Sequence, residues 1–133
     1  MAAHIILIPK ENPDPREMQP YYDHVEETMA TYGGGYQSVG RSRVTVLEGD
    51  WQPPKGSIVI LEFPSYDQAL AWYHSPEYAP LLKLRTHRGR FNTVLVDGFN
   101  PGDPVKTGRL DQWEIERIAE LEAEERAQAS QAT

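Results

Sequence analysis

Glu62 is the residue that the sequence places best for chemistry. It lies near the end of the apolar segment 58–63, which has the short apolar pattern of a β-strand. Side chains alternate along a strand, so Ile58, Ile60 and Glu62 share one face. A carboxylate beside two isoleucines is costly to bury unless it is paired. We expect Glu62 to be largely shielded from water and to act as a general base or ligand anchor. The alternative is a strand-end carboxylate that bonds a neighbour or a structural arginine.

A cluster of basic residues gives a candidate for substrate binding. The cluster consists of Lys83, Arg85, His87, Arg88 and Arg90. The fork of an arginine matches the geometry of a carboxylate or phosphate, so Arg85 could hold an anionic group of a substrate. Alternatively, the cluster is a solvated helix end whose positive charge complements the helix dipole.

A short polar segment lies between these two candidates. Ser75 precedes Pro76, a pair typical of a helix start at which the serine caps the helix. Tyr78 either packs in the core or donates a hydrogen bond from its hydroxyl to a bound carbonyl. His74, beside Ser75, could relay protons. The segment therefore combines a structural cap with two groups that could meet a substrate.

The sequence predicts neither a metal site nor a cofactor. It contains no cysteine, and none of its four histidines stands at HExxH spacing from another. The segment Gly33–Gly35 follows a predicted helix and precedes a predicted strand, which is the reverse of the order in a phosphate-binding loop. We therefore expect no metal ligands and no bound cofactor.

Composition and charge restrict the class of partner. The chain has 133 residues, of which 39% are hydrophobic and 25% are charged, as in a single globular domain. The net charge is −7, and the segment 110–133 holds seven acidic and two basic residues, which would repel nucleic-acid phosphate and anionic lipid. No apolar run approaches the roughly 18 residues of a membrane span. Because the first apolar segment also lacks the features of a signal peptide, we expect a cytoplasmic protein that binds neither nucleic acid nor membrane.

Four helices and four strands are predicted to position these residues. A capping box at Asp14–Glu17 begins the first helix, which Pro20 must kink or restart. A second capping box at Ser65–Gln68 begins the second helix, a short third helix follows Pro76, and a final helix follows Asp111. The strands are expected at 4–8, 36–47, 58–63 and 91–97.

The order of these elements is β-α-β-β-α-β, that of the α+β ferredoxin-like fold with a four-stranded antiparallel sheet. We expect this domain to span residues 1–99, followed by a Pro/Gly-rich linker and an acidic helical tail over 100–133. The strands 4–8 and 58–63 are apolar on both faces, but two helices can cover only one face of the sheet, and only the tail remains in the chain to cover the other. An open apolar face is an association surface. We therefore expect a homodimer in which a second copy covers that face.

The chain also resembles a known family. The residues that carry the resemblance are Leu47–Trp51, Ile60–Ser65, Ala69, Trp72–Tyr73, Ser75–Tyr78, Arg85 and Val96–Gly98. In this order they are similar to motifs of the domain-of-unknown-function family 1330, over about residues 4–98. The resemblance implies the fold and the sheet-to-sheet homodimer of the dimeric α/β-barrel superfamily. That superfamily includes cofactor-free monooxygenases, small-molecule isomerases and degradation enzymes, and haem enzymes, so fold alone assigns no reaction.

Two functions fit the sequence. The first is a homodimeric enzyme that performs cofactor-free acid–base chemistry on a small carbonyl or enolisable compound. Its catalytic residues would be Glu62 and Tyr78, and its substrate-binding residues Arg85, Ser75 and His74. Of these, Glu62, Tyr78 and Arg85 are expected near the cavity. The second is a non-catalytic module that binds a small molecule or a protein partner, with the tail helix as the contact. A pocket on which these side chains converge would favour the enzyme.

Overall fold

The computed structural model describes residues 2–11, 14–40, 42–52, 58–88, 91–98 and 110–132. The chain divides into two units, residues 1–100 and 101–133. Each unit is described by itself.

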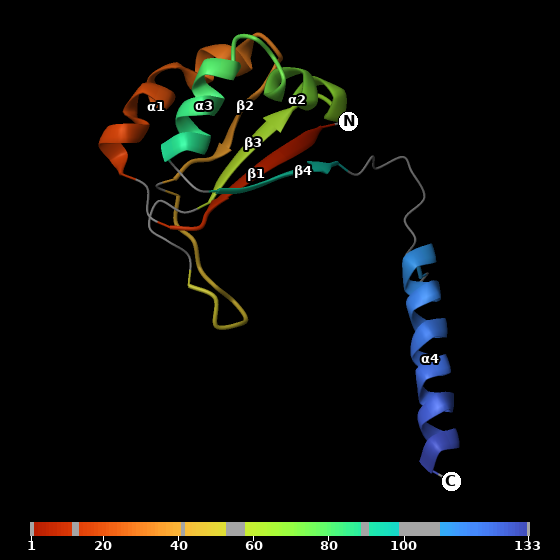
Figure 1. Cartoon of the computed structure of the whole chain (residues 1–133). Coiled ribbons are helices and arrows are strands. Elements are labelled where there is room, and N and C mark those ends of the chain that lie inside the picture. The colour runs from red at the N-terminus through yellow and green to blue at the C-terminus, as the bar shows by residue number, and fades with distance from the viewer. Residues whose placement is uncertain are drawn as a thin grey trace. The chain divides into compact units, whose positions relative to one another are not determined.

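The first unit contains a four-stranded sheet and three helices (Figure 1). In chain order its elements are β1 (Ala3–Pro9), α1 (Pro15–Ala30), β2 (Gly35–Ser38), β3 (Val59–Phe63), α2 (Tyr66–Tyr73), α3 (Ala79–Arg88) and β4 (Phe91–Asp97). The strand order is β2-β3-β1-β4, and every neighbouring pair is antiparallel. The predicted α+β ferredoxin-like fold is therefore confirmed.

Local side-chain hydrogen bonds begin the first two helices where the sequence predicts them. Oδ1 of Asp14 accepts from the backbone N–H of Arg16 at 2.9 Å, and Oγ of Ser65 accepts from the backbone N–H of Gln68 at 3.1 Å. Both bonds satisfy N–H groups that the first turn of a helix leaves unpaired. Of the two outcomes predicted at Pro20, a kink or a restart, the restart does not occur, because α1 continues through this residue as one helix.

The second strand is much shorter than predicted. The sequence favours a strand over 36–47, whereas β2 ends at Ser38 and residues 43–47 have no regular secondary structure. A turn closes directly after the strand: the backbone N–H of Ser42 donates to the carbonyl of Val39, and the backbone N–H of Val39 donates to Oγ of Ser42. The partner strand β3 pairs with β2 only as far as Ser38. A strand without a partner leaves its backbone groups unpaired, so the chain turns instead.

The hydrophobic core lies between the sheet and its three helices, which all cover the same face (Figure 1). From the sheet, alternate residues of β1 and β3 point into this core, among them Ile5, Leu7, Leu61 and Phe63. From the helices, the buried side chains are Met18, Tyr21, Val25, Met29, Ala69, Trp72 and Leu81. This face of the sheet, called here the helix face, carries the hydrophobic core.

The opposite face of the sheet, called here the open face, is also apolar at its centre. Ile6 in β1 pairs with Ile60 in β3 on one side and with Val94 in β4 on the other. Val94 and Val96 are 50% and 47% exposed. None of the described helices of the first unit covers this face (Figure 1).

The second unit contains α4 (Gln112–Ala132). As predicted, Asp111 begins it: the carbonyl of Asp111 accepts from the backbone N–H groups of Glu114 and Ile115, and its N–H donates to Oε1 of Glu114 at 2.9 Å. Its apolar side chains are exposed, namely Trp113, Ile115, Ile118 and Leu121. In the part of the chain that the structure describes, no helix is both long and apolar enough to cross a membrane.

Two neighbouring glycines should respond differently to the same substitution. A Cβ on Gly34 would overlap the ring of Phe63, whereas a Cβ on Gly35 would meet no atom within 4 Å. We expect Gly34→Ala to lower the free energy of unfolding by about 1–3 kcal/mol through overpacking. Gly35→Ala, in a strand, should leave it unchanged or raise it slightly. Urea unfolding of both variants measures the difference, and equal effects would contradict the packing around Phe63.

Candidate functional site

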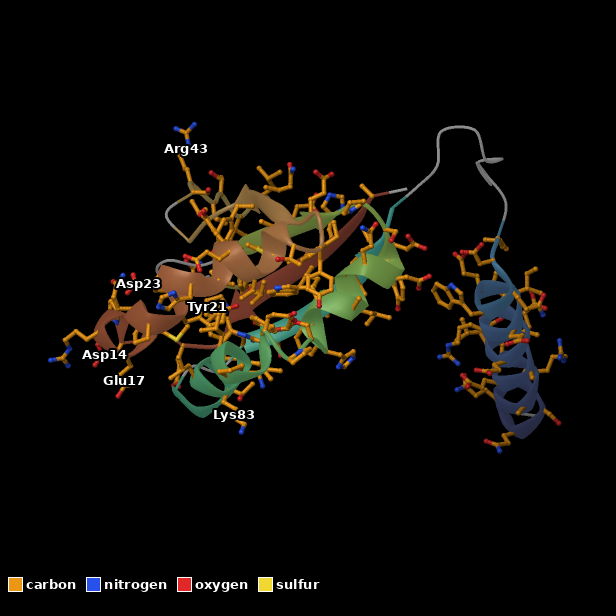
Figure 2. All side chains as sticks on the ribbon, turned by 90° about the horizontal axis from the view of Figure 1, so that it is seen from above. Asp14, Glu17, Tyr21, Asp23, Arg43 and Lys83 are labelled. Carbon is orange, nitrogen blue, oxygen red and sulfur yellow. The ribbon has the colours of Figure 1, made fainter. Side chains whose placement is uncertain are left out.

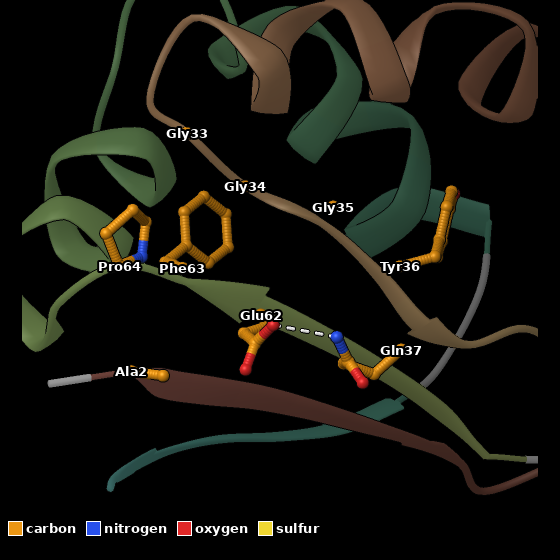
Figure 3. Close-up of a pocket in the computed structure, with 9 residues that line it drawn as sticks. All are labelled: Ala2, Gly33, Gly34, Gly35, Tyr36, Gln37, Glu62, Phe63 and Pro64. Atoms are coloured by element: carbon orange, nitrogen blue, oxygen red, sulfur yellow. Dashed lines mark hydrogen bonds between the residues drawn. The ribbon is translucent and has the colours of Figure 1, made fainter.

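Glu62 lies in a small cluster of polar side chains on the open face. It occupies β3, where it pairs with His4 of β1 and with Gly35 of β2. Oε2 of Glu62 accepts a hydrogen bond from Nε2 of Gln37 at 2.7 Å (Figure 3). Oε1 of Glu62 lies 3.4 Å from Nε2 of His4. Gln37 reaches this position because the register of β2 shifts between Tyr36 and Ser38. Three segments distant in sequence thus place a carboxylate, an amide and an imidazole together.

The cluster borders a pocket of about 380 Å³, called here the Glu62 pocket (Figure 3). It is lined by Ala2, Gly33, Gly34, Gly35, Tyr36, Gln37, Glu62, Phe63 and Pro64. The glycines have distinct roles in this wall. Gly33 has a φ of +77°, which favours glycine, and Gly34 leaves room for the Phe63 ring. Gly35 has no such constraint, because a Cβ there would meet no atom within 4 Å.

This arrangement is suited to proton transfer. The carboxylate of Glu62 accepts a hydrogen bond from the amide nitrogen of Gln37 and lies beside the imidazole of His4, a side chain that can both accept and donate a proton. A carboxylate held at the edge of a pocket can take a proton from a bound molecule, and a neighbouring histidine can carry that proton further. The Glu62 side chain remains 41% exposed in the single chain.

The prediction that Glu62 is largely shielded is therefore wrong for the single chain. The reason is its strand position: Leu61 and Phe63 point into the core, so Glu62 between them points to the face that no helix covers (Figure 3). The prediction that Glu62 shares a cavity with Tyr78 and Arg85 is also wrong, since those two side chains are buried on the helix face.

Arg85 and Tyr78 belong to a buried network on the helix face. Nε of Arg85 donates to the Tyr78 hydroxyl at 3.3 Å, and one terminal nitrogen donates to Oγ1 of Thr93 at 3.0 Å. The hydroxyls of Tyr78 and Tyr21 share a hydrogen bond of 2.7 Å. The guanidinium also lies 5.4 Å from the ring centroid of Phe91. Figure 2 shows Tyr21 between α1 and α3, whereas Lys83, from the predicted basic cluster, points outward from α3.

Burial controls the ionisation of this network. It raises the pKa of Tyr21 well above its ordinary value, an effect that neighbouring Tyr78 reinforces. Burial also raises the pKa of Tyr78, although Arg85 acts in the opposite direction. For Arg85, burial disfavours the charge, but the hydroxyls of Tyr78 and Tyr21 outweigh it and the pKa of the guanidinium rises. At neutral pH the network therefore contains one positive charge and two neutral phenols.

Ser75 and His74 lie in the turn between α2 and α3. Oγ of Ser75 donates to the carbonyl of Trp72 at 2.7 Å and accepts from the backbone N–H of Tyr78 at 3.1 Å, which is the capping contact that the sequence suggests. The His74 side chain instead borders a second pocket, of about 220 Å³. This second pocket, called here the Thr93 pocket, is lined by Ile5, Ala69, Leu70, Tyr73, His74, Thr93, Val94 and Leu95.

The remaining members of the basic cluster, His87, Arg88 and Arg90, have side chains outside the described residues. Within the described part of the chain, no group of three or more His, Asp or Glu side chains could hold a metal ion.

Sequence reasoning missed His4, Gln37, Tyr21 and Thr93. Strand alternation places His4 on the same face of β1 as Ile6 and Ile8. Its position opposite Glu62 depends on the register in which β1 and β3 pair. Gln37, Tyr21 and Thr93 make their contacts with residues of other helices or strands, and the spacing of residues along the sequence does not predict such contacts.

The fold is that of a ferredoxin-like α+β protein, with one pocket beside Glu62 and a second beside Thr93. The family model described as "Domain of unknown function (DUF1330)" matches residues 3–99, and the chain belongs to this family. No curated protein matches the sequence.

Two solved structures with a TM-score above 0.5 confirm the fold. A protein of unknown function from Rhodopseudomonas palustris aligns with a TM-score of 0.59 at 15% identity, covering 75% of this chain and 84% of that one. A methylated form of the same protein aligns at 0.54 and 14% identity, covering 77% and 84%. The cofactor-independent oxygenase SnoaB from Streptomyces nogalater aligns at 0.44 and 10% identity, covering 77% and 96%.

Tyrosine ionisation should report the burial of these side chains. Burial and Glu26 raise the pKa of Tyr36 to about 12, and the pKa values of Tyr21 and Tyr78 are raised as well. Because the pKa of each of these tyrosines is higher in the folded than in the unfolded protein, folding favours the neutral phenol. The resulting contribution to the free energy of unfolding is complete below the unfolded-state pKa of about 10 and is lost as the pH rises above it. Absorbance at alkaline pH should show late-ionising tyrosines that are lost on unfolding, and Tyr36→Phe should remove the component near pH 12. One transition near pH 10 for every tyrosine would contradict this.

Proposed function

We propose that this protein is a homodimeric enzyme that moves a proton to or from carbon in a small carbonyl compound, without a cofactor. The observation that carries the proposal is the Glu62 cluster: the side chains of Glu62 and Gln37 are hydrogen-bonded at the wall of a pocket of about 380 Å³, and the imidazole of His4 lies 3.4 Å from the carboxylate. A pocket of this volume lies at the small end of ligand sites. It therefore suits a metabolite-sized substrate.

The chemistry follows from the positions of the side chains. Glu62 takes a proton from the carbon next to the carbonyl group, and the electrons of that C–H bond move to the carbonyl oxygen to form an enolate. Gln37 donates one N–H to Glu62 and retains a second N–H, which is available to the enolate oxygen. His4 exchanges the proton with Glu62, so the proton can return to the same carbon or to a neighbouring one.

The open face of the sheet supports the homodimer. Its apolar centre, formed by Ile6, Ile60 and Val94, requires cover that the described helices of the first unit do not give. A second copy related by a two-fold axis presents the same surface to it. Because His4 and Glu62 lie on this face, pairing would also remove water from the cluster and strengthen its electrostatic interactions.

The exposed apolar side chains of α4 favour a second function, that of a binding module. The side chains of Trp113, Ile115, Ile118 and Leu121 are exposed on this helix, which is a surface that a protein partner could cover. In this alternative the chain is a non-catalytic binding module, and the Glu62 pocket holds a ligand without converting it.

Hydrogen exchange at carbon tests the enzyme directly. A panel of small ketones, 1,3-diketones and keto acids is incubated with the protein in D₂O, and loss of the α-proton signals is followed by NMR. We expect Glu62→Gln to slow enzyme-catalysed exchange by about 10²–10⁴-fold, because general base catalysis contributes a factor of this size. The variant keeps the shape of the side chain, so circular dichroism should show an unchanged fold.

Glu27→Gln is the matched control, since Glu27 is an exposed acid on α1. It should exchange at the rate of the original protein. Equal exchange by Glu62→Gln and the original protein, or no exchange above the buffer rate across the panel, would contradict catalysis at Glu62 and favour the binding module.

A further inference from the structure

Arg85 is a buried positive charge without an acidic partner among the described residues. Its side chain comes from α3 and is 3% exposed. Its described hydrogen-bond partners are the hydroxyls of Tyr78 and Thr93, and its aromatic contact is Phe91, all of them uncharged. The ion pairs of the described residues do not include Arg85. A buried charge is costly unless an opposite charge is near, so this position favours an anion.

The neighbouring phenols do not provide that anion at neutral pH. Tyr78 and Tyr21 hold a short hydrogen bond between them, and burial favours their neutral forms. Tyr78 is fully buried and Tyr21 nearly so, which leaves no room for a ligand beside their hydroxyls. An anion must therefore approach Arg85 from another side.

Thr93 connects Arg85 to the Thr93 pocket. Its Oγ1 accepts the guanidinium N–H at 3.0 Å, and the same residue lines the pocket between α2, β1 and β4. A hydroxyl that accepts from a cation directs its own proton away from that cation and becomes a better donor. His74 adds a second polar group to the pocket wall.

The other walls of the pocket are mainly apolar and aromatic. They are formed by Ile5, Ala69, Leu70, Tyr73, Val94 and Leu95. A volume of about 220 Å³ is below the roughly 300–1,000 Å³ of pockets that hold drug-sized ligands. The pocket thus fits a small molecule with one negatively charged end and a compact apolar body.

We propose that the Thr93 pocket binds a small organic monocarboxylate, with its carboxylate against the Thr93 hydroxyl and His74 and its apolar body against Leu70 and Leu95. Arg85 acts behind Thr93 by polarising the hydroxyl and supplying the positive charge. This site is separate from the Glu62 pocket, because Thr93 points to the helix face and Glu62 to the open face. The proposal therefore stands or falls independently of catalysis at Glu62.

Benzoate is a suitable probe, and benzamide is its uncharged counterpart. Binding is measured by titration calorimetry and by NMR chemical-shift changes of the full-length protein at pH 7. We expect millimolar or tighter benzoate binding, with benzamide at least about tenfold weaker, since a hydrogen bond to a charged group contributes more than one to a neutral group. Thr93→Val, which has nearly the same shape, should weaken benzoate binding about tenfold or more.

Three further variants separate this site from its alternatives. His74→Phe leaves Arg85 and Thr93 in place and keeps a ring in the wall, so it tests the site even if Thr93→Val folds poorly; it should weaken benzoate binding severalfold. Thr86→Val, at an exposed threonine of α3, is the matched control and should bind like the original protein. Glu62→Gln should also leave benzoate affinity unchanged.

Equal affinities for benzoate and benzamide would overturn the proposal, because the charge of Arg85 would then play no part. Full benzoate affinity in both Thr93→Val and His74→Phe would overturn it as well. Absence of saturable benzoate binding at millimolar concentration would show that the Thr93 pocket takes no small monocarboxylate of this kind.

Discussion

The strand β1, at the centre of the sheet, carries apolar side chains on both faces, and the rest of the structure depends on how each face is covered. Ile5 and Leu7 of β1 are buried under the helices, whereas Ile6 and Ile8 point to the opposite face. Burying apolar side chains is the main favourable contribution to folding. The three helices of the first unit satisfy this requirement on one side only, because two β-α-β halves place their helices on the same face. The open face therefore combines exposed apolar side chains such as Val94 with the polar side chains of His4 and Glu62.

Alternation along the strands assigns polar side chains to two separate environments. On the open face, Glu62 lies with His4 near the β2 edge of the sheet. On the helix face, Arg85 and Thr93 lie beside buried tyrosines. The first environment contains a carboxylate that can accept a proton, and the second contains a cation that can hold an anion. Because the two sites occupy different faces, a protein with both could bind two ligands without steric conflict, and a variant at one site should leave the other intact.

Local features of the sequence predicted the fold well, and the candidate site only in part. The caps Asp14 and Ser65 act through bonds to residues two or three positions away, so spacing alone identifies them. The order of elements then defines the topology. Glu62 was recognisable as a polar residue in an apolar strand, but its partner His4 depends on strand register, which the sequence does not contain. The contact between Tyr21 and Tyr78 joins residues 57 positions apart and depends on how the helices pack. The strand predicted over 36–47 was too long because β3 offers no partner beyond its short pairing with β2.

The mass of the protein in solution tests most directly whether the open face is covered by a second copy. Val96 on the open face and Tyr22 on α1 are both 47% exposed, so Val96→Lys and Tyr22→Lys are variants matched in exposure that differ in the face they alter. Light scattering at micromolar concentration should give twice the 15.1 kDa of one chain for the original protein and for Tyr22→Lys. Val96→Lys should give a folded species of 15.1 kDa or a strongly weakened dimer, because it places a charge in the apolar interface. A folded monomer of the original protein, or a Val96→Lys dimer as stable as the Tyr22→Lys dimer, would contradict the account.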